Sequence, residues 1–307
     1  MKVFLSAVQA GNRSGTGRYT EELITALLAS GDVDLTVESE YPWPGAGHVW
    51  SRRMSRIVGP GGGYDVMHYP ANFCPLLGTR NTVVTVHDLS FLRHPEWFSA
   101  ERARYYRAAF AITRRRAKRF IADSHATKRD LIEIARVAED KIDVAHLGVS
   151  PDFRRTDATA IADVRERYKL PEHFFLYVGT LEPRKNLPRL LAAFDQAAED
   201  LPQHLVIAGR AGWKVAGIQQ ALAVMRHSDR VHFPGFVEDA DLPAVLSASE
   251  GFAWPSLFEG FGLPPLEALA CGVPVLTSNT SSLPELFGGR AILVQPESVA
   301  EIAMGLR

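Results

Sequence analysis

The sequence predicts an α/β protein built from two consecutive doubly wound parallel sheets. Short runs rich in β-branched and aromatic residues alternate with helical patterns along all 307 residues, as in βαβ units. A second series of such runs begins near Phe174, after a polar, charged stretch. A chain of this length is normally divided into two domains, and 46% hydrophobic residues are enough for two cores.

Six strands are expected in the first half of the chain. Each is a short apolar run that is followed by a turn or by a helical pattern. The expected strands are Val3–Val8, Leu35–Glu38, Asp65–Tyr69, Thr82–His87, Arg119–Ala122 and Lys141–Ala145. The expected helices include Arg18–Ala29, Ala100–Arg116 and Ala126–Ile134.

The second half repeats this organisation. Its expected strands are Phe174–Val178, Leu205–Ala208, Val231–Phe233, Gly251–Ala253 and Val275–Thr277. We expect a first domain over residues 1–155, a linker over 156–171 and a second domain over 172–307. Ligands of such sheets bind at the carboxyl ends of the strands, so a cleft between the two domains is the expected site.

Composition excludes several classes of protein. No apolar run reaches the roughly 20 residues of a membrane-spanning helix. The first eight residues indicate a strand rather than a signal peptide. The two cysteines, Cys74 and Cys271, lie far apart in the sequence. We therefore expect no disulfide framework and no zinc site, and a cytoplasmic protein.

Charge is divided unevenly between the two halves. Residues 1–155 carry 22 Lys and Arg against 17 Asp and Glu, whereas the remainder carries 12 against 18. Such asymmetry indicates different partners for the two halves, with something anionic meeting the first.

The most informative segment runs from Phe258 to Glu267. Its sequence, Phe-Glu-Gly-Phe-Gly-Leu-Pro-Pro-Leu-Glu, sets Glu259 and Glu267 eight positions apart around a glycine turn and a proline-started helix. Prolines suit the first helical turn. The backbone N–H groups just before them favour an anion, and glycine lets backbone approach a ligand closely. The segment is typical of a nucleotide-diphosphate cradle with a carboxylate at either end.

Each glutamate alone also fits a plain interpretation, as a surface residue of a helical first turn or of a solvated turn. In the context of the glycines, Glu-x7-Glu resembles the signature of the retaining glycosyltransferases of family 4. That resemblance implies the GT-B fold, with Glu267 on the ribose and Glu259 on the sugar hydroxyls of a nucleotide-sugar. Backbone N–H groups would complete the cradle at Gly260, Phe261, Gly262 and Leu263.

A basic pair opens the second domain. Arg184 and Lys185 stand just ahead of an expected helix for which Asn186 is a suitable N-cap. Cations are disfavoured at that end of a helix. A local charge network would offset the cost, and a bound pyrophosphate would offset it better, because Arg grips two oxygens and Lys adds a point charge. The segment Glu182–Asn186 resembles a second motif of the same family, in which the basic pair holds the donor diphosphate.

Glycines follow three strands of the second domain. Gly179, Gly209 and Gly235 each stand at a strand end, and Phe236 follows the last of them. They suit a nucleotide-base pocket, and the resemblance implies backbone contacts to the base. Ordinary strand-ending turns would look the same.

In the first domain, Gly15, Thr16 and Gly17 precede a helix and suit close approach to phosphate or sugar. The spacing to Glu38 is also compatible with a dinucleotide-binding loop. Against this, several residues separate Val8 from Gly15, and a third small residue is missing.

Two further residues follow strands of the first domain. His87 ends an apolar strand and is followed by Asp88. A structural histidine is the usual interpretation, but the resemblance implies that His87 contacts the transferred sugar. It likewise implies that Ser124 lies near the reacting groups.

No metal is expected. Asp32-Val33-Asp34 matches the Asp-x-Asp pattern of metal-binding glycosyltransferases, but it lies on a turn that enters a strand. With two cations and a helix end available, the diphosphate needs no divalent ion.

The segment from Arg102 to Arg119 carries eight basic residues interleaved with Tyr105, Tyr106 and Phe110. A solvated basic face is one interpretation. Docking on anionic lipid headgroups is the other, at about 1 kcal/mol for each basic residue near the surface. Nucleic acid is not expected as a partner, because the overall charge is even and no recognised binding motif is present.

The sequence thus predicts a retaining, metal-independent hexosyltransferase. The chain resembles the mannosyl- or rhamnosyltransferases of bacterial polysaccharide assembly, which implies GDP-mannose as the first candidate donor, held by the second domain. The resemblance also implies that the first domain binds the acceptor, a glycan or lipid-linked glycan. His87, Glu259, Arg184 and Lys185 are the expected catalytic residues. The alternatives are another GT-B enzyme, such as a nucleotide-sugar epimerase or a trehalose or sucrose synthase, and a non-catalytic nucleotide- or glycan-binding protein. The sequence ends within a helical pattern, so further C-terminal helices of the family are expected to be missing.

Overall fold

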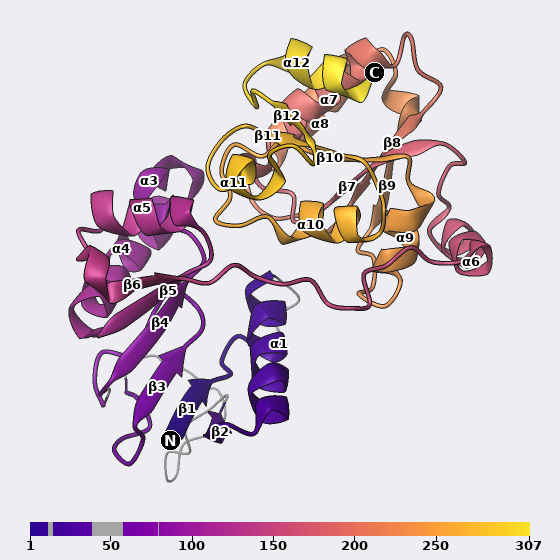
Figure 1. Ribbon diagram of the computed structural model, residues 1–307. Coiled ribbons are helices and arrows are strands. Elements are labelled where there is room, and N and C mark those ends of the chain that lie inside the picture. Colours follow the sequence, from indigo (N-terminus) through magenta and orange to yellow (C-terminus); the bar gives the residue numbers. More distant parts are fainter. Residues whose placement is uncertain (12–14, 39–57, 79) are drawn as a thin grey trace, which may run out of the picture. The chain divides into compact units, whose positions relative to one another are not determined.

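The computed structural model of the protein describes residues 1–11, 15–38, 58–78 and 80–307 (Figure 1). The chain divides into two compact units, Met1–Leu147 and Gly148–Arg307. Each unit is an α/β domain with its own β-sheet. The predicted fold class is confirmed. None of the helices in these described ranges is long and apolar enough to cross a membrane.

The first unit is a six-stranded parallel sheet with the order β2-β1-β3-β4-β5-β6. Its strands are β1 (Lys2–Ser6), β2 (Asp34–Glu38), β3 (Val66–Tyr69), β4 (Thr82–Val86), β5 (Arg119–Ala122) and β6 (Ile142–Val144). Its helices are α1 (Gly15–Ser30), α3 (Ser90–Arg93), α4 (Ala100–Arg116) and α5 (His125–Glu133), with short 3-10 turns at Pro95–Trp97 and Glu139–Lys141. Apolar side chains of the central strands and of α4 and α5 form its core.

The second unit has the strand order β12-β11-β10-β7-β8-β9, again parallel. Its strands are β7 (Phe174–Val178), β8 (His204–Ala208), β9 (Val231–Gly235), β10 (Gly251–Trp254), β11 (Val275–Ser278) and β12 (Ile292–Val294). Its α-helices are α6 (Ala158–Tyr168), α7 (Leu187–Ala197), α8 (Ala216–Val224), α9 (Leu242–Ala248), α10 (Leu263–Ala270), α11 (Leu283–Phe287) and α12 (Val299–Leu306). The 3-10 turns are η3 (Pro183–Lys185) and η4 (Ser228–Arg230). Figure 1 shows α7, α8 and α12 on one face of this sheet and α9 and α10 on the other.

The expected strands match the observed ones to within one or two residues at each end, but the boundary between the units and one strand differ from the expectation. The division between the units falls after Leu147, and residues 156–171, expected as a linker, lie within the second unit and include α6. Strand β12 was not expected. It has three residues, of which Val294 is buried. A run of this length is too short for a periodic signal.

Candidate functional site

The basic motif of Arg184 and Lys185 and the acidic motif of Glu259 follow neighbouring strands of the second unit. Strand β7 leads through Gly179 into η3, which carries Arg184 and Lys185, and β10 leads into the loop that carries Glu259. Because β7 and β10 pair directly in the parallel sheet, the loops beyond their carboxyl ends meet at one edge.

Glu259 pairs with both cations. Its Oε2 accepts a hydrogen bond from Nη1 of Arg184 at 2.7 Å, and its Oε1 accepts one from Nζ of Lys185 at 2.7 Å. The indole N–H of Trp254 also donates to Oε1, at 3.0 Å. Glu182 accepts from Nε of Arg184 at 2.5 Å. Sequence reasoning proposed the cations and Glu259 but gave no role to Glu182 or Trp254.

Burial strengthens the interactions between the charges of this cluster. Glu259 and Lys185 are 6% and 7% exposed. Burial alone would raise the pKa of Glu259, but the charges of Arg184 and Lys185 lower its pKa to about 2. Burial lowers the pKa of Lys185 and the charge of Arg184 lowers it further, while Glu259 acts in the opposite direction. Glu259 is therefore ionised at neutral pH and serves as the common counterion of the two cations.

The two cations differ in access. The Arg184 side chain keeps 22% of its surface exposed, against 8% for Lys185. Nζ of Lys185 lies 4.4 Å from the ring centroid of Trp254, whose other contacts include a stacked Tyr177. A ligand at this edge therefore reaches Arg184 more readily than Lys185.

The glycine-rich segment before α10 is held by Ser282. Gly262 is the N-cap of α10 with φ of 118°, and Pro264 and Pro265 follow in the first turn as expected. The hydroxyl of Ser282 donates to the carbonyls of Glu259 and Phe261, at 3.0 and 2.8 Å. Glu267 lies on α10 and is buried, at 3% exposure, so it is not a solvated surface residue.

The glycines at the strand ends divide into two kinds. A Cβ on Gly209 would lie 2.0 Å from the carbonyl oxygen of Gly179, and one on Gly179 would lie 2.8 Å from the ring of Trp254. These two glycines are required by close packing of adjacent strand ends. Gly235, with φ of 85°, faces open space. The guanidinium of Arg210 lies 4.2 Å from the ring centroid of Phe236, which forms a flat platform at the ends of β8 and β9.

Asn186 does not cap α7 with its side chain, and the N-cap prediction is wrong in that respect. The residue occupies the N-cap position in a left-handed conformation, with φ of 62°. Its Nδ2 donates to the carbonyls of Pro255 and Pro296, at 2.9 and 2.6 Å. Asn186 therefore ties the basic loop to the loop after β10 and to a more distant segment.

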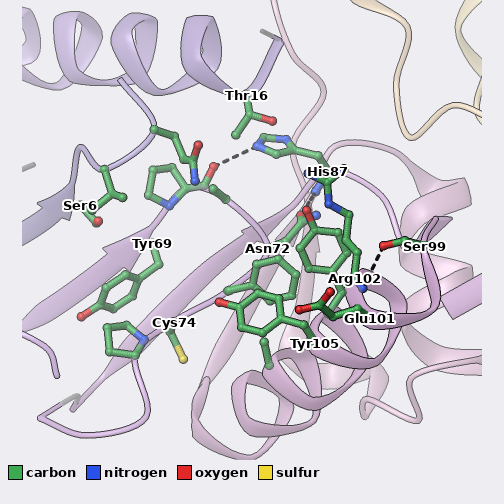
Figure 2. Close-up of a pocket in the computed structure, with 18 residues that line it drawn as sticks. Ser6, Thr16, Tyr69, Asn72, Cys74, His87, Ser99, Glu101, Arg102 and Tyr105 are labelled. Carbon is green, nitrogen blue, oxygen red and sulfur yellow. Dashed lines mark hydrogen bonds between the residues drawn. The ribbon is translucent and has the colours of Figure 1, made fainter. Parts of the chain in front are cut away.

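A cavity of about 860 Å³ lies at the carboxyl ends of β1, β3 and β4 in the first unit (Figure 2). His87 and Thr16 line one part of it, and the first half of α4 forms a wall that includes Tyr105. Thr16 and His87 are thus brought together. Ser124 does not line this cavity: it is fully buried and caps α5, accepting from the N–H of Thr127 at 3.0 Å.

Both ring nitrogens of His87 have acceptors. Nδ1 lies 2.6 Å from Oδ2 of Asp123, and Nε2 lies 2.9 Å from the carbonyl oxygen of Pro70. Burial alone would lower the pKa of His87, but the Asp123 carboxylate and the Pro70 carbonyl outweigh it and raise that pKa. An imidazolium that donates two hydrogen bonds satisfies both contacts.

A buried network supports the His87 ring. The ring of Tyr19 meets it edge-on at 4.9 Å. The Tyr19 hydroxyl pairs with Oγ1 of Thr85 at 3.0 Å, and Nε2 of His68 pairs with the same oxygen at 2.8 Å. Burial, together with the charge of His87, lowers the pKa of His68 to about 4, so His68 is neutral. No local sequence pattern marks these partners, because Tyr19, His68 and Thr85 come from three different elements, α1, β3 and β4.

The glycines before α1 are part of the helix. Gly15 is its first residue, and a Cβ there would meet no atom within 4 Å. Gly17 is buried in the same turn, one residue after Thr16. Gly15 therefore leaves space at the helix start, whereas Gly17 is buried.

The fold and these two sites define a class of protein, which comparison with known families identifies. Residues 161–307 match the family described as glycosyl transferases group 1, and residues 34–153 match glycosyltransferase family 4. The chain belongs to these glycosyltransferases of the GT-B type.

Among curated proteins, O-antigen chain mannosyltransferase B of Escherichia coli is 31% identical over 242 residues, which are 78% of this chain and 64% of that protein. The serotype-specific mannosyltransferase WbdA of Escherichia coli is 32% identical over 261 residues, 81% of this chain and 31% of that protein. The chain thus spans less than two thirds of the length of these relatives.

Solved structures share the fold at low sequence identity. The crystal structure of Anabaena Alr3699/HepE in complex with UDP and glucose has a TM-score of 0.70 and 21% identity, over 99% of this chain and 88% of that one. WaaG, a glycosyltransferase involved in lipopolysaccharide biosynthesis, has a TM-score of 0.72 and 16% identity, over 100% and 90%.

Proposed function

We propose that the protein is a retaining glycosyltransferase that moves a mannosyl group from GDP-mannose to a glycan acceptor in the assembly of a surface polysaccharide. The Arg184–Glu259–Lys185 cluster is the observation that carries this proposal. It fixes two cations and a carboxylate at the strand ends where α/β sheets bind ligands, beside the start of α10. The mannosyl donor is chosen because both curated relatives are mannosyltransferases, one of an O-antigen chain and the other serotype-specific.

The cluster gives each side chain a separate task. Arg184, the more exposed cation, contacts the diphosphate of the donor. Lys185 lies deeper and fixes the Glu259 carboxylate, which then accepts hydrogen bonds from the sugar hydroxyls. Glu267 binds the ribose, and the backbone N–H groups of 260–263 face the phosphates.

Catalysis follows from charges that are already in position. As the bond between the sugar and the diphosphate breaks, the sugar becomes oxocarbenium-like and negative charge grows on the leaving group. Cations held by the fold stabilise that charge most in the transition state. We assign no divalent ion to the reaction. Turnover that EDTA abolishes and that only Mg²⁺ or Mn²⁺ restores would contradict this assignment.

We also place the enzyme in the cytoplasm, at the inner face of the cell membrane. Part of the basic segment Arg102–Arg119 is used within the unit: Arg114 of α4 donates to the carbonyl of Ala135 at 2.9 Å, and Arg119 of β5 pairs with Asp143 at 2.8 Å. The exposed residues Arg104, Arg107 and Arg115 lie on one helical face of α4. This face suits anionic headgroups.

The test combines binding with turnover. A thermal-shift screen with GDP-mannose, UDP-glucose and GDP identifies the donor, because a ligand that binds the native state raises its melting temperature. GDP release is then measured with and without a mannose-terminated saccharide. Acceptor-dependent GDP release supports the proposal. Binding with no release identifies a nucleotide-binding protein, and acceptor-independent conversion of GDP-mannose to another nucleotide-sugar identifies an epimerase.

A further inference from the structure

Trp254 ends strand β10, just before the loop that carries Glu259, and its side chain is buried, at 1% exposure. A ligand does not reach a side chain at this depth. The indole nevertheless contacts both charges at the centre of the site. Its N–H donates to Oε1 of Glu259 at 3.0 Å, and its ring faces Nζ of Lys185, with 4.4 Å between that atom and the ring centroid. Trp254 therefore acts on a ligand only through these two residues.

The strands on both sides of β10 fix the position of this indole. Tyr177, on β7, stacks on it with 4.9 Å between the ring centroids, and Phe252, two residues earlier on β10, lies nearly parallel at 5.8 Å. Oγ1 of Thr277, on β11, donates to the Trp254 carbonyl at 3.0 Å. Gly179 leaves the space that the indole fills, since a Cβ there would lie 2.8 Å from the ring. An indole held in this way directs its N–H to one place.

The hydrogen bonds give the two oxygens of the Glu259 carboxylate different surroundings. Oε1 accepts from the indole of Trp254 and from Nζ of Lys185, which together occupy the two lone pairs of that oxygen. Oε2 accepts from Nη1 of Arg184, which is the more exposed cation. A hydroxyl that approaches this carboxylate therefore meets Oε2, and not Oε1.

The indole is the rigid member among the donors to Glu259. The ammonium of Lys185 ends a flexible four-carbon stem and carries three rotatable donors, so it fixes a charge but no direction. The indole N–H is a single donor on a stacked ring, and hydrogen bonds to a carboxylate are roughly twice as strong as neutral ones. The face of the same ring stabilises the ammonium, and such a contact gains strength where water is excluded. Trp254 thus fixes both the rotation of the carboxylate and the place of its buried counterion.

We propose that Trp254 is a positioning residue of the transferase site: it orients Glu259 so that Oε2 receives the sugar hydroxyls of the donor. The inference rests on the proposed transferase function and adds a residue on which recognition of the sugar depends. Recognition of the diphosphate does not depend on Trp254, because the guanidinium of Arg184 is also held by Glu182.

The test separates the sugar of the donor from its nucleoside diphosphate. Trp254→Phe keeps an aromatic face beside Lys185 but removes the N–H, so kcat/KM for GDP-mannose should fall about tenfold, the equivalent of about 1.4 kcal/mol. The Kd for GDP, measured by calorimetry, should stay within twofold. Phe174→Leu is the matched control, because Phe174 is fully buried in the same core but lies at the opposite end of β7. It should lower the melting temperature and leave kcat/KM within twofold.

The indole itself supplies a second measurement, which needs no substitution. The protein has five tryptophans, so isotope-labelled tryptophan gives a small set of indole N–H signals in NMR spectra, and triple-resonance assignment identifies that of Trp254. We expect this N–H to be protected from hydrogen exchange. Its chemical shift should change when GDP-mannose binds and stay in place when GDP binds.

Three results would overturn the inference while leaving the transferase function intact. They are wild-type kcat/KM in Trp254→Phe, a loss of GDP affinity as large as the loss of kcat/KM, and an equal loss of kcat/KM in Phe174→Leu. Where Trp254→Phe does not fold, the indole signal of the wild type decides: a response to GDP-mannose alone supports the inference, and the same response to both ligands, or none, overturns it. If the wild type neither binds GDP-mannose nor releases GDP, the proposed function fails and this inference fails with it.

Discussion

Nδ1 of His87 lies 2.6 Å from Oδ2 of Asp123, and this contact fixes what His87 can do. The Asp123 side chain is 2% exposed and that of His87 16%, so the pair is shielded from solvent. With Nε2 directed at the carbonyl of Pro70, the imidazolium has no lone pair to accept a proton. His87 is therefore suited to supply positive charge to a ligand of the cavity in the first unit, and not to act as a general base. Asp123 is its positioning residue.

Replacing Asp123 by Asn should lower the pKa of His87 measured by NMR titration, because the carboxylate favours the charged ring. In the wild type the pKa of His87 is raised on folding, so its contribution to stability is fully present below pH of about 6.5 and is lost as pH rises through the folded-state pKa. The free energy of unfolding of the variant should therefore fall furthest below that of the wild type at pH 5.5, and less so at pH 8.5. Equal differences at both pH values would contradict the charged pair.

Replacing Lys185 should reduce both stability and turnover. Lys185→Ala leaves the buried Glu259 with one cation fewer, and removal of one partner from a buried pair costs about 3–5 kcal/mol. GDP-mannose turnover should fall at least tenfold. Chemical denaturation and GDP-release kinetics measure the two effects. Arg226→Ala is the control, because the Arg226 side chain also forms ion pairs but is itself 66% exposed. Full activity of Lys185→Ala would show that Lys185 has no role in the active site.

The fold was predictable from the sequence because the strands are short, apolar and regularly separated. The expected segments Arg119–Ala122 and Phe174–Val178 coincide with β5 and β7. Strand β4 ends one residue earlier than expected, at Val86, which leaves His87 on the following loop. Strand β12 was missed because three residues carry no detectable period.

The site was predictable only where its residues are adjacent in sequence. Arg184 with Lys185, and Glu259 with Glu267, each form a local motif that sequence reasoning recognised. Asp123 and Ser282 act through contacts with residues 36 and more than 20 positions away, and no local pattern marks them. Gly209 has two compatible explanations: its motif suits a base pocket, and the carbonyl oxygen of Gly179 leaves no room for a side chain there.

Gly209→Ala should prevent folding or destabilise the second unit severely. The new Cβ would lie 2.0 Å from a backbone oxygen, and φ of 144° is strained for any side chain. Gly217→Ala is the matched control: it lies in α8, and its Cβ would meet its nearest atom at an ordinary 3.6 Å. Alanine there should stabilise by roughly 0.5–1 kcal/mol. Thermal unfolding of both variants gives the comparison, and a folded Gly209→Ala would contradict the packing described.

Removing the exposed charges of α4 should weaken binding to anionic vesicles. Each of Arg104, Arg107 and Arg115 is expected to contribute about 1 kcal/mol, or about fivefold in affinity, at a phosphatidylglycerol surface. Cosedimentation of the triple serine variant measures the loss, which should shrink as salt rises. Arg119→Ser is the control, since Arg119 is paired with Asp143. Equal vesicle binding by the triple variant would exclude α4 as the membrane surface.

The platform of Arg210 and Phe236 should bind the nucleotide base. Stacking of a base on an aromatic ring contributes about 1–3 kcal/mol, so Phe236→Ala should weaken GDP at least fivefold. Phe236→Tyr keeps the ring and should preserve binding. Inorganic pyrophosphate separates base from phosphate recognition, because its affinity depends on Arg184 and should not change in Phe236→Ala. Calorimetry with GDP, UDP and pyrophosphate gives all three comparisons. If pyrophosphate and GDP weaken together, the ring supports the phosphate loop instead, and the base must lie elsewhere on this sheet edge.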